Sequence, residues 1–385
     1  MKNILLLNKI SKVGTDVFTS DYVLSDNVVN PDGIMVRSAV MHDMTFDASL
    51  KAIARAGAGV NNIPVEECAK QGIVVFNTPG ANANGVKELT VAALLLASRD
   101  IYGGITWANS LKGSEGVAKA VEKGKSAFTG VEIMGKTLGV IGLGAIGRLV
   151  ANAAVALGMN VVGCDPFLSA EAAKLLDPAV KTVSYFDDVF KACDYLTVHV
   201  PATKDTKGMI NNTSLSLMKD GVRIVNLSRA ELVNSDDMIA AVENGKVASY
   251  VTDFPTDEMV GIKGIVTIPH LGASTEEAED NCAKMAAAEL IDYLENGNIK
   301  NSVNYPNLVL DREGLARVAV LSNADAGVSA AFNAVLADCS VAPAHFMTAT
   351  KGAFAYTVAD FADDNVDDIV NKLSTVEGVI RVLSF

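Results

Sequence analysis

One glycine-rich motif in the sequence has the spacing that a dinucleotide requires. Gly142-Leu143-Gly144-Ala145-Ile146-Gly147 follows the apolar run LGVIG and opens a helical pattern, and Asp165 ends the next apolar run, eighteen residues after Gly147. In this motif Gly142 permits a tight turn, Gly144 lets a pyrophosphate approach the backbone, and Gly147 allows close packing of helix on strand. The carboxylate of Asp165 can accept hydrogen bonds from a ribose diol and would repel a 2′-phosphate. The motif predicts NAD rather than NADP, and a βαβ turn without a ligand is the alternative.

Three charged or titratable side chains stand close to the ends of apolar runs. His270 follows IVTIP, Arg229 follows RIVNLS, and Glu258 lies in the intervening loop DFPTDE. In an open α/β sheet, ligands bind at the carboxyl ends of the strands. A histidine transfers protons near neutral pH, and the planar guanidinium of an arginine suits a carboxylate. Each residue taken alone is also compatible with a solvated or locally paired side chain.

The elements that would position these residues alternate between short strands and helices. The runs ILLLN, IMVRSA and IVVFNTPG precede residue 85, and a second series of strands starts at Lys136. Such alternation predicts βα units on parallel sheets. From Val86 to Asp100 the chain is apolar almost all round, which is typical of a helix buried at an interface. The helix in SDDMIAAVENG is expected to have Ser235 as its cap.

The last segment has a different pattern. A polar linker near residues 301–313 leads to LARVAVLS, GVSAAFNAVLAD, VAPAHFMTAT, AFAYTVADF, VDDIVNKLSTVEG and VIRVLSF. These runs predict the order βαββαβ of a ferredoxin-like sandwich.

Composition limits the classes of partner. Half of the 385 residues are hydrophobic and 20% are charged, so the chain can bury a large core and is not a disordered chain. The formal charge of −13 argues against nucleic acid and anionic membranes as main partners, which require a basic face. No apolar run is long enough to predict a signal peptide or a membrane span. The five cysteines form no CxxC pair and no metal-ligand spacing, which predicts no metal site and a reducing, cytoplasmic location.

Four motifs follow the glycine motif in a fixed order, namely HVPAT, NLSRA, DFPTDE and PHLGAST. Together with VRSA, RAGAGVNNI and VVFNTPGAN near the amino terminus, they resemble the D-isomer-specific 2-hydroxyacid dehydrogenases over residues 1 to 300. Within that family the chain is most similar to the members that act on 3-phospho-D-glycerate. The terminal βαββαβ pattern resembles the ACT-type regulatory domain that is often appended to those members.

The resemblance implies an α/β fold in which a Rossmann-type doubly wound nucleotide domain is inserted in a flavodoxin-like substrate domain. A ferredoxin-like, ACT-like domain would follow at the carboxyl end. The expected domains are 1–85 (substrate domain, first part), 86–272 (NAD-binding domain), 273–306 (return helix of the substrate domain) and 307–385 (ACT-like regulatory or assembly domain).

The resemblance also implies the roles of the catalytic residues. His270 would be the acid–base that takes the hydroxyl proton, Arg229 would bind the C1 carboxylate, and Glu258 would hydrogen-bond the histidine ring. Matching the family pattern DVFPTE through its FPT letters would select Asp257 instead. Glu258 is preferred because it keeps the distance from Asp253 and has the longer carboxylate.

Further binding residues follow from the same resemblance. The cofactor crevice would be lined by Gly142, Gly144, Ala145, Ile146, Gly147, Asp165, His199, Val200, Pro201, Thr206 and Asn226, with Asp253 near the nicotinamide carboxamide. His199 is alternatively a core histidine on a buried strand. The substrate's phosphate and carboxylate would be held by Arg37, Ser38, Gly59, Val60 and Asn61. A guanidinium beside backbone amides suits a phosphate, and a solvated strand end is the alternative.

The implied function is NAD-dependent oxidation of 3-phospho-D-glycerate to 3-phosphohydroxypyruvate, the first step of L-serine biosynthesis, by a homodimer or homotetramer. Another D-2-hydroxyacid, such as glycerate, is the first alternative, and an NAD-sensing, corepressor-like binding protein is the second. Ala230 and Ala273 stand where relatives carry glycine, and the loop SNADAGV lacks the usual proline of an ACT loop. Because Asn323 lies four residues before Gly327 and Asp325 adds negative charge, the terminal domain is expected to support assembly and to bind serine weakly or not at all.

Overall fold

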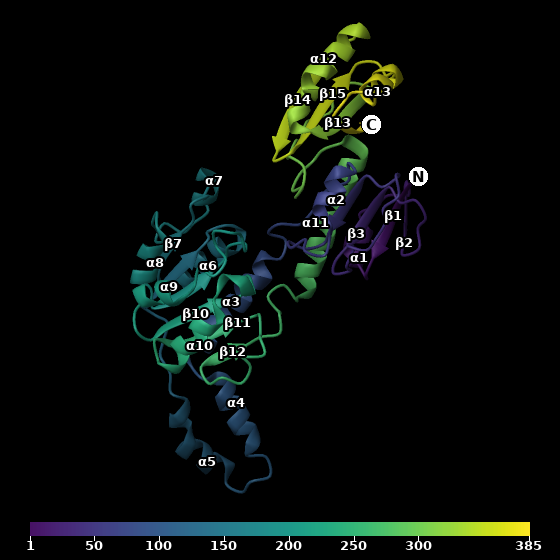
Figure 1. Ribbon diagram of the computed structural model, residues 1–385. Helices are drawn as coiled ribbons and strands as arrows, with labels where there is room; N and C mark the ends of the chain where they lie inside the picture. Colours follow the sequence, from purple (N-terminus) through teal and green to yellow (C-terminus); the bar gives the residue numbers. More distant parts are fainter. The chain divides into compact units, whose positions relative to one another are not determined.

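The computed structural model describes all 385 residues, which divide into two compact units. Unit 1 contains Met1–Asn82 and Glu276–Phe385, and unit 2 contains Ala83–Thr275. The chain therefore begins unit 1, builds the whole of unit 2 and then returns to complete unit 1 (Figure 1). The boundaries of the four domains expected from the sequence stay predictions. No helix combines the length and the apolar character needed to cross a bilayer.

The first sheet of unit 1 is parallel, in the order β2-β1-β3-β4-β5, which is the flavodoxin-like order. Its strands are β1 (Lys2–Leu7), β2 (Tyr22–Ser25), β3 (Gly33–Val36), β4 (Ala52–Arg55) and β5 (Val74–Phe76). Neighbouring side chains of β3 enter different cores, because Ile34 and Val36 join one apolar cluster and Met35 joins another. Both faces of this sheet are therefore buried, as the apolar runs predict.

Three helices accompany this sheet, namely α1 (Lys12–Thr15), α2 (Val65–Lys70) and α11 (Glu276–Asn296). Helix α11 buries Cys282, Ala286 and Leu290 at helical spacing against the strands. A Cβ atom on Gly14 would lie 2.5 Å from the Cβ of Ala283, so only glycine lets α1 approach α11 this closely. The first and last parts of unit 1 are thus held together by direct helix contacts.

Unit 2 is built around a parallel seven-stranded sheet in the order β12-β11-β10-β9-β6-β7-β8. This is the doubly wound Rossmann order, with its switch point between β6 and β9. Its strands are β6 (Thr137–Ile141), β7 (Asn160–Cys164), β8 (Lys181–Thr182), β9 (Tyr195–Val198), β10 (Val222–Asn226), β11 (Val247–Thr252) and β12 (Ile265–Thr267). The fold class predicted for the nucleotide domain is confirmed.

The helices of unit 2 are α3 (Ala83–Ser98), α4 (Ile101–Ser110), α5 (Val117–Gly124), α6 (Ala145–Ala156), α7 (Ala170–Ala173), α8 (Phe186–Ala192), α9 (Asn212–Leu217) and α10 (Ser235–Glu243). The cap predicted for α10 is wrong by one residue. Asn234 is the N-cap, and its side chain accepts a hydrogen bond from the amide of Asp237. Asparagine and serine both cap helices well, so residue type alone does not decide between neighbours.

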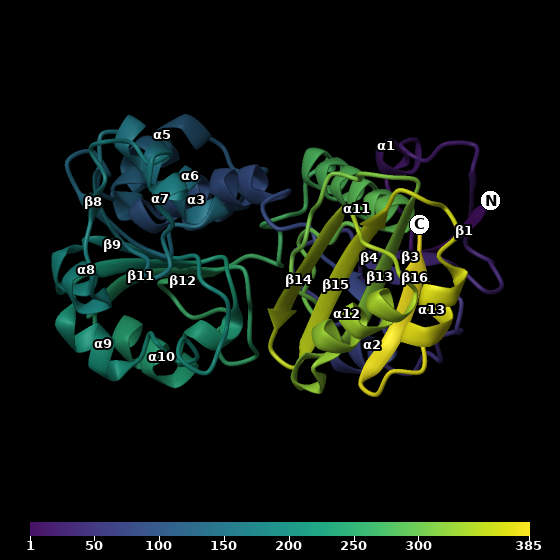
Figure 2. The same cartoon turned by 90° about the horizontal axis from the view of Figure 1, so that it is seen from above.

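The terminal part of unit 1 forms an antiparallel sheet in the order β14-β15-β13-β16. Its elements are β13 (Ala316–Asn323), α12 (Val328–Asp338), β14 (His345–Lys351), β15 (Phe354–Phe361), α13 (Asp367–Leu373) and β16 (Val379–Ser384). Both helices cover one face of the sheet (Figure 2). On the other face Leu321, Tyr356 and Val358 share an apolar cluster with Leu290 and Tyr293 of α11. The predicted ferredoxin-like order is confirmed.

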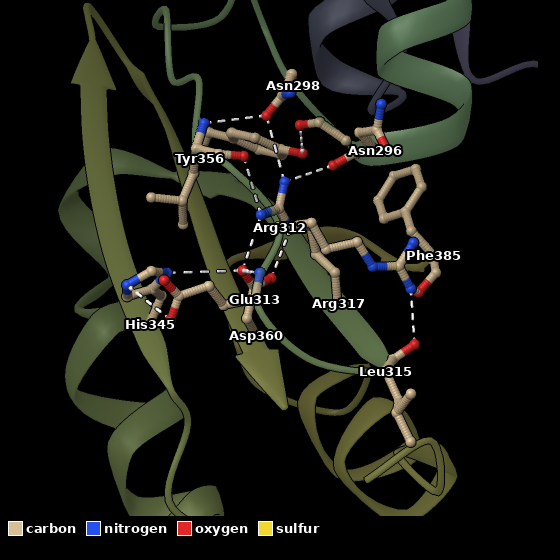
Figure 3. Close-up of polar contacts among 12 residues, drawn as sticks. Asn296, Asn298, Arg312, Glu313, Leu315, Arg317, His345, Tyr356, Asp360 and Phe385 are labelled. Carbon is tan, nitrogen blue, oxygen red and sulfur yellow. Dashed lines mark hydrogen bonds and ion pairs between the residues drawn. The ribbon is translucent and has the colours of Figure 1, made fainter. Parts of the chain in front are cut away.

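A fully buried ion pair fixes the terminal sheet (Figure 3). Arg317 donates from Nε and Nη2 to the two carboxylate oxygens of Asp360, at 2.6 and 2.8 Å. Its guanidinium also donates to the backbone carbonyls of Asn296 and Leu310, at 2.7 and 3.0 Å. Because every side of the guanidinium is used, the pair links the terminal sheet to the end of α11 and to the linker that follows it.

Helix α11 also buries a carboxyl group that is only half paired. Oε1 of Glu289 accepts a hydrogen bond from the side-chain amide of Asn301 at 2.7 Å. Oε2 is buried without a hydrogen-bond partner. Burial raises the pKa of Glu289 from 4.5 to about 7. The folded protein therefore prefers the protonated form of this side chain at pH values where the unfolded chain is already ionised.

We expect Glu289→Gln to change how stability depends on pH. With the folded pKa above the unfolded one, the favourable contribution of Glu289 is complete below pH 4.5 and is lost as pH rises through about 7. The variant should therefore gain up to about 3 kcal/mol of unfolding free energy over the native protein at pH 8, and little at pH 5. Urea unfolding at both pH values measures this, with the exposed Glu276→Gln of the same helix as control. An equal effect at both pH values would contradict the assignment.

Candidate active site

The glycine loop after β6 has the geometry that each glycine predicts. Gly142 has a φ of +88°, and a Cβ there would lie 2.6 Å from the carbonyl oxygen of His199. A Cβ on Gly147 would lie 1.9 Å from the carbonyl oxygen of Gly142, so α6 could not pack against the loop with any other residue. A Cβ on Gly144 would meet nothing within 4 Å. The space beside Gly144, at the amino end of α6, therefore fits a pyrophosphate against the backbone.

Asp165 stands directly after β7 and holds the same loop. Its Oδ2 accepts the amide hydrogen of Leu143 at 2.9 Å, and its Oδ1 accepts that of Phe167 at 2.9 Å. The carboxylate thus lies beside the glycine loop, where an adenosine ribose would have to lie in a Rossmann domain. Its assignment to the ribose stays a prediction.

The loop after β9 carries the residues of the HVPAT motif. Nε2 of His199 lies 3.0 Å from the hydroxyl of the buried Thr197, and its Nδ1 is buried without a partner. Burial lowers the pKa of His199 to about 4, so the ring is neutral at pH 7. The hydroxyl of Thr206 donates to the carbonyl of Pro201 at 2.5 Å and so closes the loop that also contains Val200. Contacts of these residues with a cofactor stay predictions.

The turn that carries Arg229 is built by Asn226, the last residue of β10. The side-chain amide of Asn226 donates to the carbonyl of Arg229 at 2.8 Å, and its Oδ1 accepts the amide of Ser228 at 3.1 Å. Asn226 is fully buried, whereas Arg229 is exposed. The Arg229 guanidinium donates to the carbonyl of its neighbour Ser228 at 2.6 Å. The turn therefore presents a cation at the carboxyl end of the sheet.

His270 is held by a buried carboxylate in a second turn. Asp253, directly after β11, accepts the amides of Leu271 and Gly272 through its two carboxylate oxygens, both at 2.7 Å. The amide of His270 donates to the carbonyl of Asp253 at 3.1 Å. His270 has a φ of +55°, a conformation that is uncommon for residues other than glycine and needs such support. Asp253 therefore shapes the turn, and its contact with nicotinamide stays a prediction.

The imidazole of His270 contacts an aromatic ring. The rings of Phe254 and His270 meet edge to face, with centroids 5.0 Å apart. Glu258 and Asp257 are both exposed, and neither forms a hydrogen bond with His270 in this structure. The backbone amide of Glu258 itself is the main cause that lowers the pKa of its carboxyl group. Which carboxylate pairs with the histidine during turnover stays a prediction.

In unit 1, the segment after β3 is organised by one asparagine. Asn8, which follows β1 with a φ of +83°, accepts the amides of Arg37, Ser38 and Ala39 on its Oδ1, at 3.3, 3.0 and 2.9 Å. The backbone amides beside Arg37 are thus already used within the protein. The turn of Gly59, Val60 and Asn61 is contacted by His42, whose Nε2 lies 2.9 Å from the carbonyl of Asn61.

A second arginine, which the sequence analysis did not single out, lies beside Arg37. Arg55 ends β4 and donates from Nε to the carbonyl of Arg37 at 3.0 Å. A Cβ on Gly57 would lie 2.1 Å from Nη1 of Arg55, so the glycine makes room for this guanidinium. The guanidinium of Arg37 itself pairs with Glu279 of α11 at 2.5 Å. The sequence could have indicated Arg55, because this arginine stands at the end of an apolar run, as Arg37 does. No three His, Cys, Asp or Glu side chains gather to hold a metal ion.

Several known proteins are similar to this chain in sequence. Residues 91–272 match the D-isomer specific 2-hydroxyacid dehydrogenase, NAD binding domain. The D-3-phosphoglycerate dehydrogenase of Bacillus subtilis (strain 168) is 34% identical over 330 residues, covering 81% of this chain and 60% of that protein. The chain spans about half to three-fifths of the length of the curated relatives it matches.

Two solved structures extend the comparison to the fold. An NAD+-bound 3-phosphoglycerate dehydrogenase of Entamoeba histolytica is 26% identical, with a TM-score of 0.61 over 80% of this chain and 99% of that one. A glyoxylate reductase of Paecilomyes thermophila is also 26% identical, with a TM-score of 0.65 over 78% of this chain and 98% of that one.

We expect Gly144→Val to abolish dinucleotide binding while the domain stays folded. The space that a side chain would fill is open in the protein alone, so the substitution should cost little stability. In the complex the valine would occupy the place of the pyrophosphate. Titration with NADH, followed by its fluorescence, measures binding, and thermal unfolding checks the fold. Gly104→Ala, on α4 and outside this loop, is the control, because a Cβ there would make only ordinary contacts with Phe128. Unchanged NADH affinity in Gly144→Val would contradict the site.

Proposed function

Because the chain belongs to the D-isomer-specific 2-hydroxyacid dehydrogenase family, we propose that it is an NAD-dependent D-3-phosphoglycerate dehydrogenase. It would oxidise 3-phospho-D-glycerate to 3-phosphohydroxypyruvate, the first step of L-serine biosynthesis. The observation that carries this proposal is the edge of the unit 2 sheet. There the loop with open Gly144, the Arg229 turn and the His270 turn all follow strands of one parallel sheet.

Each of these groups has a task in the oxidation of a secondary alcohol. The glycine loop from Gly142 to Gly147 would hold NAD, which would supply the acceptor for the hydride on the carbon that carries the hydroxyl. His270 takes the hydroxyl proton, the acid–base role for which histidine is the side chain used most often, and its exposed ring is open to a substrate. Arg229 binds the substrate carboxylate with its planar guanidinium and so orients the reacting carbon. Glu258 would pair with the ring of His270, and Asp165 disfavours a 2′-phosphate and hence NADP.

The far end of the substrate, by which we mean the end opposite the C1 carboxylate, is proposed to bind at Arg37 and Ser38. In 3-phosphoglycerate this end carries the phosphate. The turn of Gly59, Val60 and Asn61 would lie nearby. Arg55 supports this assignment, because its guanidinium adds a second positive charge next to Arg37. The ion pair of Arg37 with Glu279 favours the alternative, an unphosphorylated D-2-hydroxyacid, because it neutralises part of that charge. NAD-dependent turnover itself separates both readings from a corepressor-like binding protein.

We propose that the protein assembles as a homodimer or homotetramer in the cytoplasm. Helices α4 and α5 extend from the unit 2 sheet and contain no buried residue (Figure 1). Tyr102 and Ile105 of α4 are 67% and 56% exposed. Apolar side chains that project in this way are typical of surfaces that a partner covers. Five unpaired thiols, four of them buried, agree with a reducing compartment.

The activity is tested by NADH formation from 3-phosphoglycerate, glycerate and other 2-hydroxyacids. We expect the native protein to prefer 3-phosphoglycerate and NAD, and His270→Ala to lower kcat by about a hundredfold or more. NAD affinity should survive, because the glycine loop is unchanged. His345→Gln, in the terminal domain, is the matched control. Near-normal kcat in His270→Ala would refute the acid–base role, and no turnover of any 2-hydroxyacid by the native protein would refute the function.

The terminal domain is proposed to support assembly rather than feedback by serine. The loop from Ser322 to Gly327 keeps Asn323 but adds the negative charge of Asp325 where a ligand carboxylate would lie. We expect millimolar L-serine to leave most of the NADH-forming activity in place during turnover with saturating substrate. Half-inhibition at micromolar serine would overturn this prediction.

A further inference from the structure

The ion pair between Arg37 and Glu279 joins the segment after β3 to the first turns of α11. Nη2 of Arg37 lies 2.5 Å from Oε1 of Glu279, and the two side chains are 41% and 42% exposed. Because water reaches both groups, the pair contributes little to folding and can open when a stronger partner arrives. The carboxylate of Glu279 thus occupies the place on Arg37 that a substrate anion would take.

Other charged side chains lie near the carboxylate of Glu279. Burial raises the pKa of the Cys282 thiol, while the nearby charges of Arg55 and Arg37 act to lower it and that of Glu279 to raise it. Cys282 lies three residues after Glu279, on the same face of α11. Arg37 thus lies between the side chain of Arg55, which donates to its carbonyl, and the carboxylate of Glu279, which pairs with its guanidinium.

The backbone near Arg37 does not compensate for the loss of positive charge. The amides of residues 37 to 39 are all directed to Oδ1 of Asn8. An anion beside Arg37 therefore cannot use these three amides and depends more strongly on the arginine that Glu279 already holds.

We propose that Glu279 is a specificity-determining residue, the internal counter-ion of Arg37, which weakens the binding of substrates whose far end carries two negative charges. This inference rests on the proposed function. A phosphate dianion must displace Glu279 from Arg37 and then remain close to the displaced carboxylate, which repels it. A substrate with an uncharged far end, such as glycerate, neither has to displace Glu279 nor is repelled by its carboxylate. Glu279 therefore reduces the difference in binding affinity between phosphorylated and unphosphorylated 2-hydroxyacids.

The test compares the full-length native protein with Glu279→Gln and Glu277→Gln. Both substitutions remove one negative charge from the first turns of α11, but Glu277 is exposed and forms no ion pair. Inorganic phosphate binding is measured by calorimetry at fixed ionic strength, and KM and kcat are measured with 3-phosphoglycerate and with glycerate. Glu279→Gln should bind phosphate about two- to fivefold more tightly and lower KM for 3-phosphoglycerate by a similar factor. KM for glycerate and both kcat values should stay unchanged.

Three results would overturn the proposal. Equal tightening in Glu277→Gln would mean a general charge effect, and weaker phosphate binding in Glu279→Gln would mean that Glu279 only positions Arg37. Absence of phosphate binding in all three proteins would mean that no anion site exists here. The proposed function fails separately, if the native protein forms no NADH from 3-phosphoglycerate, and the phosphate titration still decides the role of Glu279 in that case.

Discussion

Four of the candidate site loops in this protein each depend on one short polar side chain at the carboxyl end of a strand. Asn8 after β1, Asp165 after β7, Asn226 at the end of β10 and Asp253 after β11 each accept backbone amides of the loop that carries a site residue. A chain that leaves a buried parallel sheet has amides without strand partners, and these must be satisfied. Asparagine and aspartate do this within one turn. The geometry of these loops is thus a consequence of satisfying backbone hydrogen bonds.

Much of the fold could be predicted from local patterns in the sequence. Gly142 and Gly147 are required by backbone contacts within a few residues, so their spacing alone reveals the turn and the helix that follows it. The alternation of strands and helices likewise predicts parallel sheets, because βα crossovers have one hand. The terminal βαββαβ order was equally readable, since each element is a separate apolar run.

The residues that sequence reasoning missed depend on contacts between distant segments. Glu279 forms an ion pair with Arg37, although the two residues are more than two hundred positions apart in the sequence. Neither local sequence motif predicts this pair. Arg55 became visible only when β4 was found beside β3. The cofactor contacts that the motifs predict for Asp253 and Asn226 stay predictions, and the structure adds that their side chains hold the His270 and Arg229 turns. A sequence motif can therefore identify a candidate residue without identifying the groups that its side chain contacts.

The divided course of unit 1 has a consequence for how the protein is made. The strands β1 to β5 are synthesised first, but Leu290 and Tyr293, which complete their core, follow only after the whole of unit 2. About 190 residues of unit 2 intervene, which corresponds to roughly 10–40 s on a ribosome adding 5–20 residues per second. During that interval the emerging sheet lacks one apolar cover, while unit 2 can already fold. The nascent chain can therefore complete unit 2 before unit 1, and the half-built sheet keeps apolar side chains uncovered in the meantime.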